Sequence, residues 1–218
     1  MIMRIVSHEI KPKKCRVRAR THQSSRPHYR ITRNRPMSEY RRWQIAGGTY
    51  FFTVVTYGRQ RFLTDTLSRQ CLRTALRRVR SRLPFKVIAV VLLPDHLHTV
   101  WELPRGDAGY GTRWRQIKTL FTSSYQPHMA ATRRLSMSRK KRNEQGVWQR
   151  RFYEHTCRDE QDLKRCVDYI HANPVKHELV TQACDWPWSS FHRYVRLGEY
   201  ENDWGGTELA GDSFPGAE

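Results

Sequence analysis

The chain has 218 residues and carries 40 Lys and Arg against 20 Asp and Glu, a formal charge of +20 with a sequence pI near 10.4. This length suits one domain with a hydrophobic core plus extra segments, and leaves little room for two full domains. So large an excess of positive charge favours a polyanionic partner, with nucleic acid ahead of an anionic membrane surface. Without an apolar run that could span a bilayer or a signal-like start, we expect a soluble, cytoplasmic protein.

Residues 1–40 are strongly basic, with eleven Lys or Arg against only Glu9 and Glu39. A segment this poor in apolar residues cannot offset its ordering entropy by burial, so we expect disorder. Two interpretations stay open: a basic arm that lies along phosphates, or translation that begins at Met37, so that residues 1–36 are not native protein. We therefore predict an N-terminal extension over 1–40, a folded domain over 41–204 and a flexible tail over 205–218.

Next in chain order come elements marked by apolar periodicity. Strand patterns cover 50–57, 85–93, 96–103 and 148–157, and the first helix runs from a cap at Asp65 or Ser68 to about Arg82. A second helix covers 112–126, and the last runs from Asp159 to Asn173, because Pro174 disfavours helical geometry in the residue before it. This order of elements predicts an α+β fold, a ferredoxin-like antiparallel sheet with helices mainly on one face.

Five cysteines show no C-x-x-C pair and no recognisable zinc-ligand spacing. The odd number argues against a complete disulfide framework and favours reduced thiols in a cytosol. Cys71 and Cys166 occupy apolar helical positions, so we expect them to be small core residues.

A second basic segment, 133–151, contains Glu144 as its only acid. It is either a solvated connector or a clamp on a phosphate backbone. Under the second interpretation the candidate DNA-binding residues are Arg133, Arg134, Arg139, Lys140, Lys141, Arg142, Arg150 and Arg151.

His96 and His98 open the third predicted strand and are separated by Leu97. Successive side chains on a strand point to opposite faces, so both imidazoles reach the same side while Leu97 packs on the other. Two imidazoles on one face can bind one metal ion, although the pair could also be two histidines on a half-buried strand.

The last helix carries an apolar stripe that includes Cys166 and Ile170. At about 100° per residue, Tyr169 and Asn173 share one flank beside this stripe, whereas His171 lies on the opposite flank. An amide oxygen of Asn173 could therefore join the two imidazoles at a metal that Tyr169 also faces. The alternative is that Tyr169 is an amphipathic packing residue whose hydroxyl reaches water.

Several segments together resemble the REP-associated tyrosine transposases, relatives of the single-tyrosine HUH transposases of bacterial insertion sequences. They occur in matching order within about residues 40–204. The matching segments are 40–57, 93–98 (Leu-Pro-Asp-His-Leu-His), 148–155, 168–177 (Asp-Tyr-Ile-His-Ala-Asn-Pro-Val-Lys-His) and 186–191. The resemblance implies that His96 and His98 are the metal-binding His-hydrophobic-His motif and that Tyr169 is the nucleophile. It matches Asn173 to a third metal ligand, with His155 as a possible substitute.

The resemblance implies a metal-dependent single-stranded DNA endonuclease and strand transferase that acts at REP-type hairpins through a 5′-phosphotyrosine intermediate. Mg²⁺ or Mn²⁺ is the expected ion, the protein is a monomer or homodimer associated with the nucleoid, and residues 41–204 are its catalytic domain. Trp114 and Trp148 either stack unpaired bases or belong to the core. Two alternatives stay open: a non-catalytic DNA or RNA hairpin-binding protein, and a small metallohydrolase that uses His96, His98 and His155.

Overall fold

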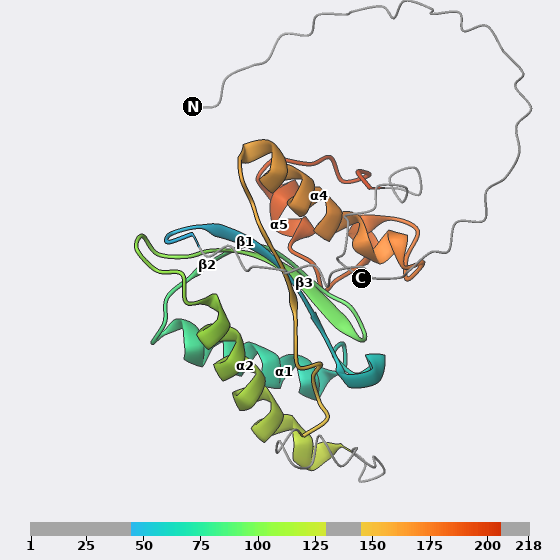
Figure 1. The fold of residues 1–218 in the computed structure, drawn as a ribbon. Helices are drawn as coiled ribbons and strands as arrows, with labels where there is room; N and C mark the ends of the chain where they lie inside the picture. The colour runs from blue at the N-terminus through green and yellow to red at the C-terminus, as the bar shows by residue number, and fades with distance from the viewer. Residues whose placement is uncertain (1–44, 130–144, 206–218) are drawn as a thin grey trace, which may run out of the picture. The chain divides into compact units, whose positions relative to one another are not determined.

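Four antiparallel strands in the order β2-β3-β1-β4 form the centre of the fold in the computed structural model, which describes residues 45–129 and 145–205 (Figure 1). The strands are β1 (Thr49–Val55), β2 (Lys86–Leu92), β3 (His96–Glu102) and β4 (Tyr153–Thr156). The helices are α1 (Thr66–Arg80), α2 (Tyr110–Tyr125), α4 (Glu160–Lys176) and α5 (Phe191–Arg196), with short 3-10 turns η1 (Tyr57–Arg59), η2 (Gln126–His128) and η3 (Ala183–Asp185). The predicted ferredoxin-like α+β class is confirmed.

One face of the sheet packs against α1 and α2 through an aromatic core. Alternation along β1 and β3 sends Phe52 and Trp101 to this side, and the Trp101 ring stacks on Trp114 of α2 with centroids 4.3 Å apart. Trp114 and Trp148 are both buried in this cluster, so they belong to the core rather than to an exposed stacking surface.

The opposite face of the sheet lies under α4 and α5 (Figure 1). Phe51 of β1 and Val100 of β3 point to this side and pack with Cys166 and Ile170 of α4. α1 and α2 share one face, but α4 and α5 cover the other, so the helices are divided between the faces rather than lying mainly on one. Both faces of β1 and β3 are therefore buried.

Two predicted boundaries are wrong. The fourth strand covers only 153–156, and Trp148 forms an isolated bridge to Thr56 instead of continuing it. The last helix runs past Pro174 to Lys176, three residues beyond the predicted end. Pro174 lacks an N–H, but the backbone N–H of His177 donates to the Asn173 carbonyl at 3.0 Å, so the helical turn is kept after the proline.

The described residues include no helix that is both long and apolar enough to cross a membrane. The predictions for residues 1–40 and for the end of the tail fall outside the described residues.

Replacing Trp101 tests the aromatic core. Trp101→Ala should lower the free energy of unfolding by about 3–5 kcal/mol, because it removes a fully buried indole and leaves a cavity against Trp114. Urea unfolding measures this change. Leu197→Ala is the control, since Leu197 is 67% exposed and its truncation should change stability very little; a comparable loss in both variants would contradict this account of the core.

Candidate active site

The two histidines of β3 lie on the α4 face of the sheet, as the strand alternation predicts. Both are buried, their ring centroids are 4.8 Å apart, and Leu97 between them packs in the α1–α2 core. β3 is an inner strand, so hydrogen bonds to β1 and β2 hold the backbone of the pair on both sides. The pair is therefore a rigid feature of the sheet.

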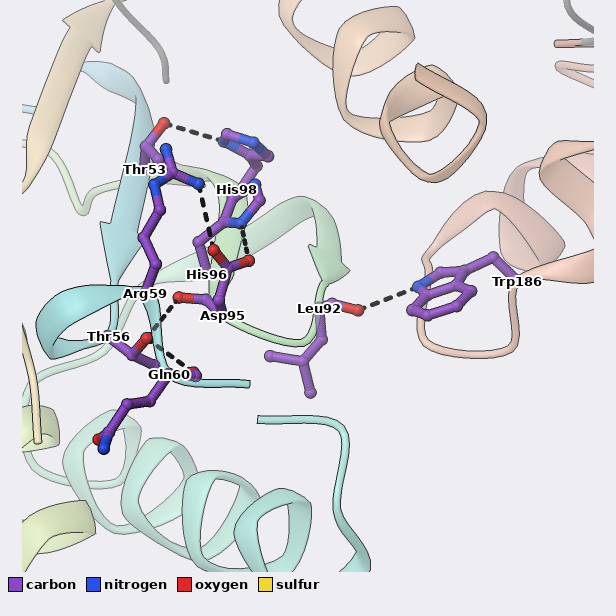
Figure 2. A network of polar contacts seen from close by, with 9 residues as sticks. All are labelled: Thr53, Thr56, Arg59, Gln60, Leu92, Asp95, His96, His98 and Trp186. Atoms are coloured by element: carbon purple, nitrogen blue, oxygen red, sulfur yellow. Dashed lines mark hydrogen bonds and ion pairs between the residues drawn. The ribbon is translucent and has the colours of Figure 1, made fainter. Parts of the chain in front are cut away.

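The Nδ1 atom of each imidazole has a partner, which orients the ring (Figure 2). Nδ1 of His98 lies 2.9 Å from Oγ1 of Thr53, its cross-strand neighbour on β1, and Nδ1 of His96 lies 2.6 Å from Oδ1 of Asp95. With Nδ1 protonated, each ring donates there and keeps the lone pair of Nε2 for a ligand. Nε2 of His98 is buried and has no hydrogen-bond partner among the residues that the structure describes. This is the arrangement of a metal-ligating histidine with its supporting outer group.

Charge around the pair keeps the supporting carboxylate ionised. Burial alone would raise the pKa of Asp95, but hydrogen bonds and charges from His96 and Arg59 outweigh it and lower the pKa to about 2. Arg59 Nη1 lies 3.1 Å from Asp95 Oδ2. Burial, followed by the positive charges of neighbouring groups, lowers the pKa of His98 well below its usual value. His98 is thus neutral near pH 7, the form that binds a cation.

Helix α4 brings Tyr169 and Asn173 to the same place. The Tyr169 ring is 5.3 Å from the His98 ring and 5.8 Å from that of Phe51, measured between centroids. Asn173, one turn later, is fully buried, and neither its oxygen nor its nitrogen has a hydrogen-bond partner within the described part of the chain. The structure therefore brings Tyr169 to the His96–His98 pair, and Asn173 is a buried residue one helical turn after it on α4.

Two further residues belong to this cluster and were missed by the sequence prediction. Lys176 Nζ lies 5.1 Å from the Tyr169 ring centroid, and the His177 ring lies 5.0 Å from that of His96. They follow Tyr169 by seven and eight positions, the spacing of one helix flank. The sequence prediction did not include them because it ended the helix before Pro174, whereas α4 runs to Lys176.

Other candidates lie elsewhere. His155 Nε2 is 2.9 Å from Asp162 Oδ2, which ties it to the first turns of α4. His171 is buried beneath α5, with Nε2 2.8 Å from Oγ of Ser190, as expected for the opposite flank. Arg150 and Arg151 are exposed, and the other basic candidates, between 133 and 142, fall outside the described residues.

A buried imidazole nitrogen and a buried carboxamide, both without partners among the described residues, are a costly combination unless a ligand completes them. Neutral imidazole and amide oxygen are donors that divalent cations accept. His96, His98 and Asn173 therefore fit a divalent metal ion.

Residues 45–173 match the family model described as transposase, IS200 like. The chain belongs to this family. Its members are tyrosine transposases, an enzyme class that is in general metal-dependent.

Individual relatives agree with this assignment. A REP-associated tyrosine transposase of Escherichia coli K12 is 44% identical over 170 residues, which cover 78% of this chain and 92% of the relative. A Haemophilus influenzae protein assigned to the same type is 43% identical over 171 residues, covering 78% of this chain and 94% of the relative. A solved structure of a REP-associated tyrosine transposase bound to a REP hairpin has a TM-score of 0.66 and 42% identity, and covers 82% of this chain and 99% of that one.

The amide of Asn173, which has no hydrogen-bond partner in residues 45–129 and 145–205, predicts a gain in stability when it is removed. In protein treated with a chelator, Asn173→Leu should raise the free energy of unfolding by about 1 kcal/mol, because an unsatisfied buried polar group is replaced by an apolar one of similar size. Urea unfolding measures the change, with Asn202→Leu as the control at an exposed position. A clear loss of stability in Asn173→Leu would mean that the amide is hydrogen-bonded in solution.

Proposed function

We propose that this IS200-like transposase is a metal-dependent single-stranded DNA endonuclease and strand transferase, with Tyr169 as the nucleophile. The observation that carries the proposal is the position of the Tyr169 ring, 5.3 Å from His98 within one chain, beside a buried imidazole nitrogen that has no partner among the described residues. A phenol and a metal-binding group this close can act on a single phosphodiester.

In the proposed step the phenol of Tyr169 gives up its proton to water, and its oxygen attacks the scissile phosphorus and forms a new P–O bond. The bond from phosphorus to the 3′ oxygen breaks, and that oxygen leaves as a hydroxyl after taking up a proton, so a 5′-phosphotyrosine remains. Attack by a second 3′ hydroxyl reverses the step on a new strand without ATP. Lys176, 5.1 Å from the Tyr169 ring, stabilises negative charge that develops on the phenol and phosphate.

His96, His98 and Asn173 would hold the divalent ion, Mg²⁺ or Mn²⁺, which when bound neutralises charge on the scissile phosphate and orients it. Asp95 and Thr53 keep the two imidazoles in the correct tautomer and direction. Imidazoles also accept Zn²⁺, so the physiological ion is part of the proposal.

The proposed substrate is single-stranded DNA beside a REP-like hairpin, since a REP hairpin is the ligand named for the solved relative. The formal charge of +20 suits a phosphate backbone. One groove between α1 and the edge of β2 is lined by arginines of α1, and Arg69 Cζ lies 3.7 Å above the Trp188 ring in it. The arginines concerned are Arg69, Arg73, Arg77 and Arg80.

The exposed Arg150 and Arg151 belong to the proposed DNA-binding surface, together with the basic residues between 133 and 142. Residues 41–204 would form the catalytic domain. Because one chain supplies both the tyrosine and the histidines, a monomer can complete the site, and a homodimer is not needed for it.

A covalent adduct tests the nucleophile. Wild-type protein with Mn²⁺ and a hairpin-bearing single strand should give a protein–DNA adduct that survives SDS gel electrophoresis. Tyr169→Phe should abolish the adduct and keep the gel shift of the uncleaved hairpin, because only the attacking oxygen is removed. Tyr194→Phe, on α5, is the matched control and should form the adduct normally. Tight hairpin binding without an adduct from the wild type would support a non-catalytic hairpin-binding protein instead.

Removing the hydroxyl of Thr53, which pairs with Nδ1 of His98, should change the metal affinity. Thr53→Val keeps the side-chain shape but removes the acceptor at Nδ1, so Mn²⁺ should bind about 10–100-fold more weakly. Electron paramagnetic resonance of unbound Mn²⁺ during a titration gives the affinity. Thr112→Val, at an exposed position of α2, should leave it unchanged. Equal affinities in all three proteins would show that Thr53 does not support the metal site.

A further inference from the structure

A second group of metal-binding side chains lies where β4 leads into α4. The ligand atoms of His155, Asp162 and Cys166 all lie within 4.8 Å of one another. Cys157 adds a second sulfur, with its Sγ 3.7 Å from Sγ of Cys166. Three side chains of the types that bind zinc thus converge, and Cys157 adjoins them through Cys166, all within a stretch of twelve positions.

The S···S and N···O separations in this group are close to those of tetrahedral zinc coordination. A Zn–S bond of about 2.3 Å places two sulfurs of a tetrahedral site roughly 3.8 Å apart, and the two cysteines already have this separation. His155 Nε2 and Asp162 Oδ2 are 2.9 Å apart, a hydrogen bond that has to open by only about half an ångström to form another edge of the tetrahedron. Cys157 lies outside the mutually close set, so its sulfur has to move toward His155 and Asp162 when the ion binds.

The surroundings hold the ligands in position. The backbone N–H of Arg158 donates to Asp162 Oδ2 at 3.1 Å, and Arg165 donates to Oδ1 at 3.2 Å. The backbone N–H of Cys157 donates to the Thr49 carbonyl at 2.9 Å, which fixes the end of β4. Hydrogen bonds of this kind around a carboxylate ligand are typical of the outer shell of metal sites.

We propose that His155, Cys157, Asp162 and Cys166 form a structural Zn²⁺ site, separate from the His96–His98 pair. Four protein ligands close the coordination sphere, so the site has no open position for a substrate. Both thiols lose their protons to solvent when the ion binds. The site links β4 to the first turns of α4 and so holds the helix that presents Tyr169 one turn later.

Ligand chemistry separates the two metal sites. Two thiolates select Zn²⁺ strongly over Mg²⁺ or Mn²⁺, whereas the His96 site offers imidazole and amide donors. The spacing of this set, H-x-C-x₄-D-x₃-C, differs from the C-x-x-C pairs of common zinc sites, so the sequence pattern does not display it. A disulfide between the two cysteines is the competing state, and it would leave His155 and Asp162 in their mutual hydrogen bond.

Metal content of the full-length protein tests the proposal. Protein purified under reducing conditions should hold one equivalent of zinc by mass spectrometry of the elements, and the His96→Ala/His98→Ala double variant should retain it. Cys157→Ser and Cys166→Ser should each weaken zinc binding by at least about a hundredfold, because each removes a direct ligand. Cys184→Ser, a free cysteine on η3, is the matched control and should keep the zinc.

Replacement of zinc by Co²⁺ gives an independent readout. The wild type and the double histidine variant should show the intense thiolate-to-cobalt absorption of a sulfur-ligated tetrahedral site, and Cys157→Ser should reduce it. If Cys166→Ser does not fold, two other variants still test the ligand set: Cys157→Ser, at a half-buried position, and Asp162→Asn. The proposal is overturned if the cysteine variants bind zinc as tightly as the wild type, or if the wild type contains a Cys157–Cys166 disulfide and no zinc. The His96→Ala/His98→Ala variant lacks the proposed catalytic metal site, so its zinc content tests the zinc proposal separately from the proposed strand transfer.

Discussion

The packing of α4 across β2 and β3, with Phe51 of β1 beside it, is the contact on which the site depends. Cys166 and Ile170 of the helix bury their side chains against Phe51 and Val100 of the sheet, and this apolar contact sets the height and rotation of the helix. The flank beside it then falls over the histidine pair, which brings the Tyr169 ring to 5.3 Å from His98. A rotation by one residue, about 100°, would carry the phenol away from the imidazoles.

The two faces of the sheet divide stability and chemistry between them. The face toward α1 and α2 is an almost wholly apolar, aromatic cluster that stabilises the fold. The face toward α4 buries imidazoles, an amide and a threonine hydroxyl, groups that lower stability unless they are satisfied. Polar burial of this kind is tolerated where a site requires it, because the opposite face supplies the hydrophobic free energy.

Helix α4 also connects two regions of metal-binding chemistry. Its first turns carry Asp162 and Cys166 beside His155, and a later turn carries Tyr169 beside His98. With zinc at the first region, the helix would be held to β4 at one end, and its later turns would present Tyr169 at the proposed catalytic site. Cys166 is a core residue, as its apolar position predicted, and in the proposed site it is also a zinc ligand.

Local periodicity alone determined much of this protein: the order of strands and helices, the shared face of His96 and His98, and the common flank of Tyr169 and Asn173. These features follow from the repeat of a strand or helix and need only neighbouring residues. The tertiary structure decided the partners Thr53 and Asp95, the pairing of His155 with Asp162, and the continuation of α4 through Pro174, which adds Lys176 and His177. Those contacts join segments whose meeting depends on which surfaces are buried together, and no local repeat encodes that.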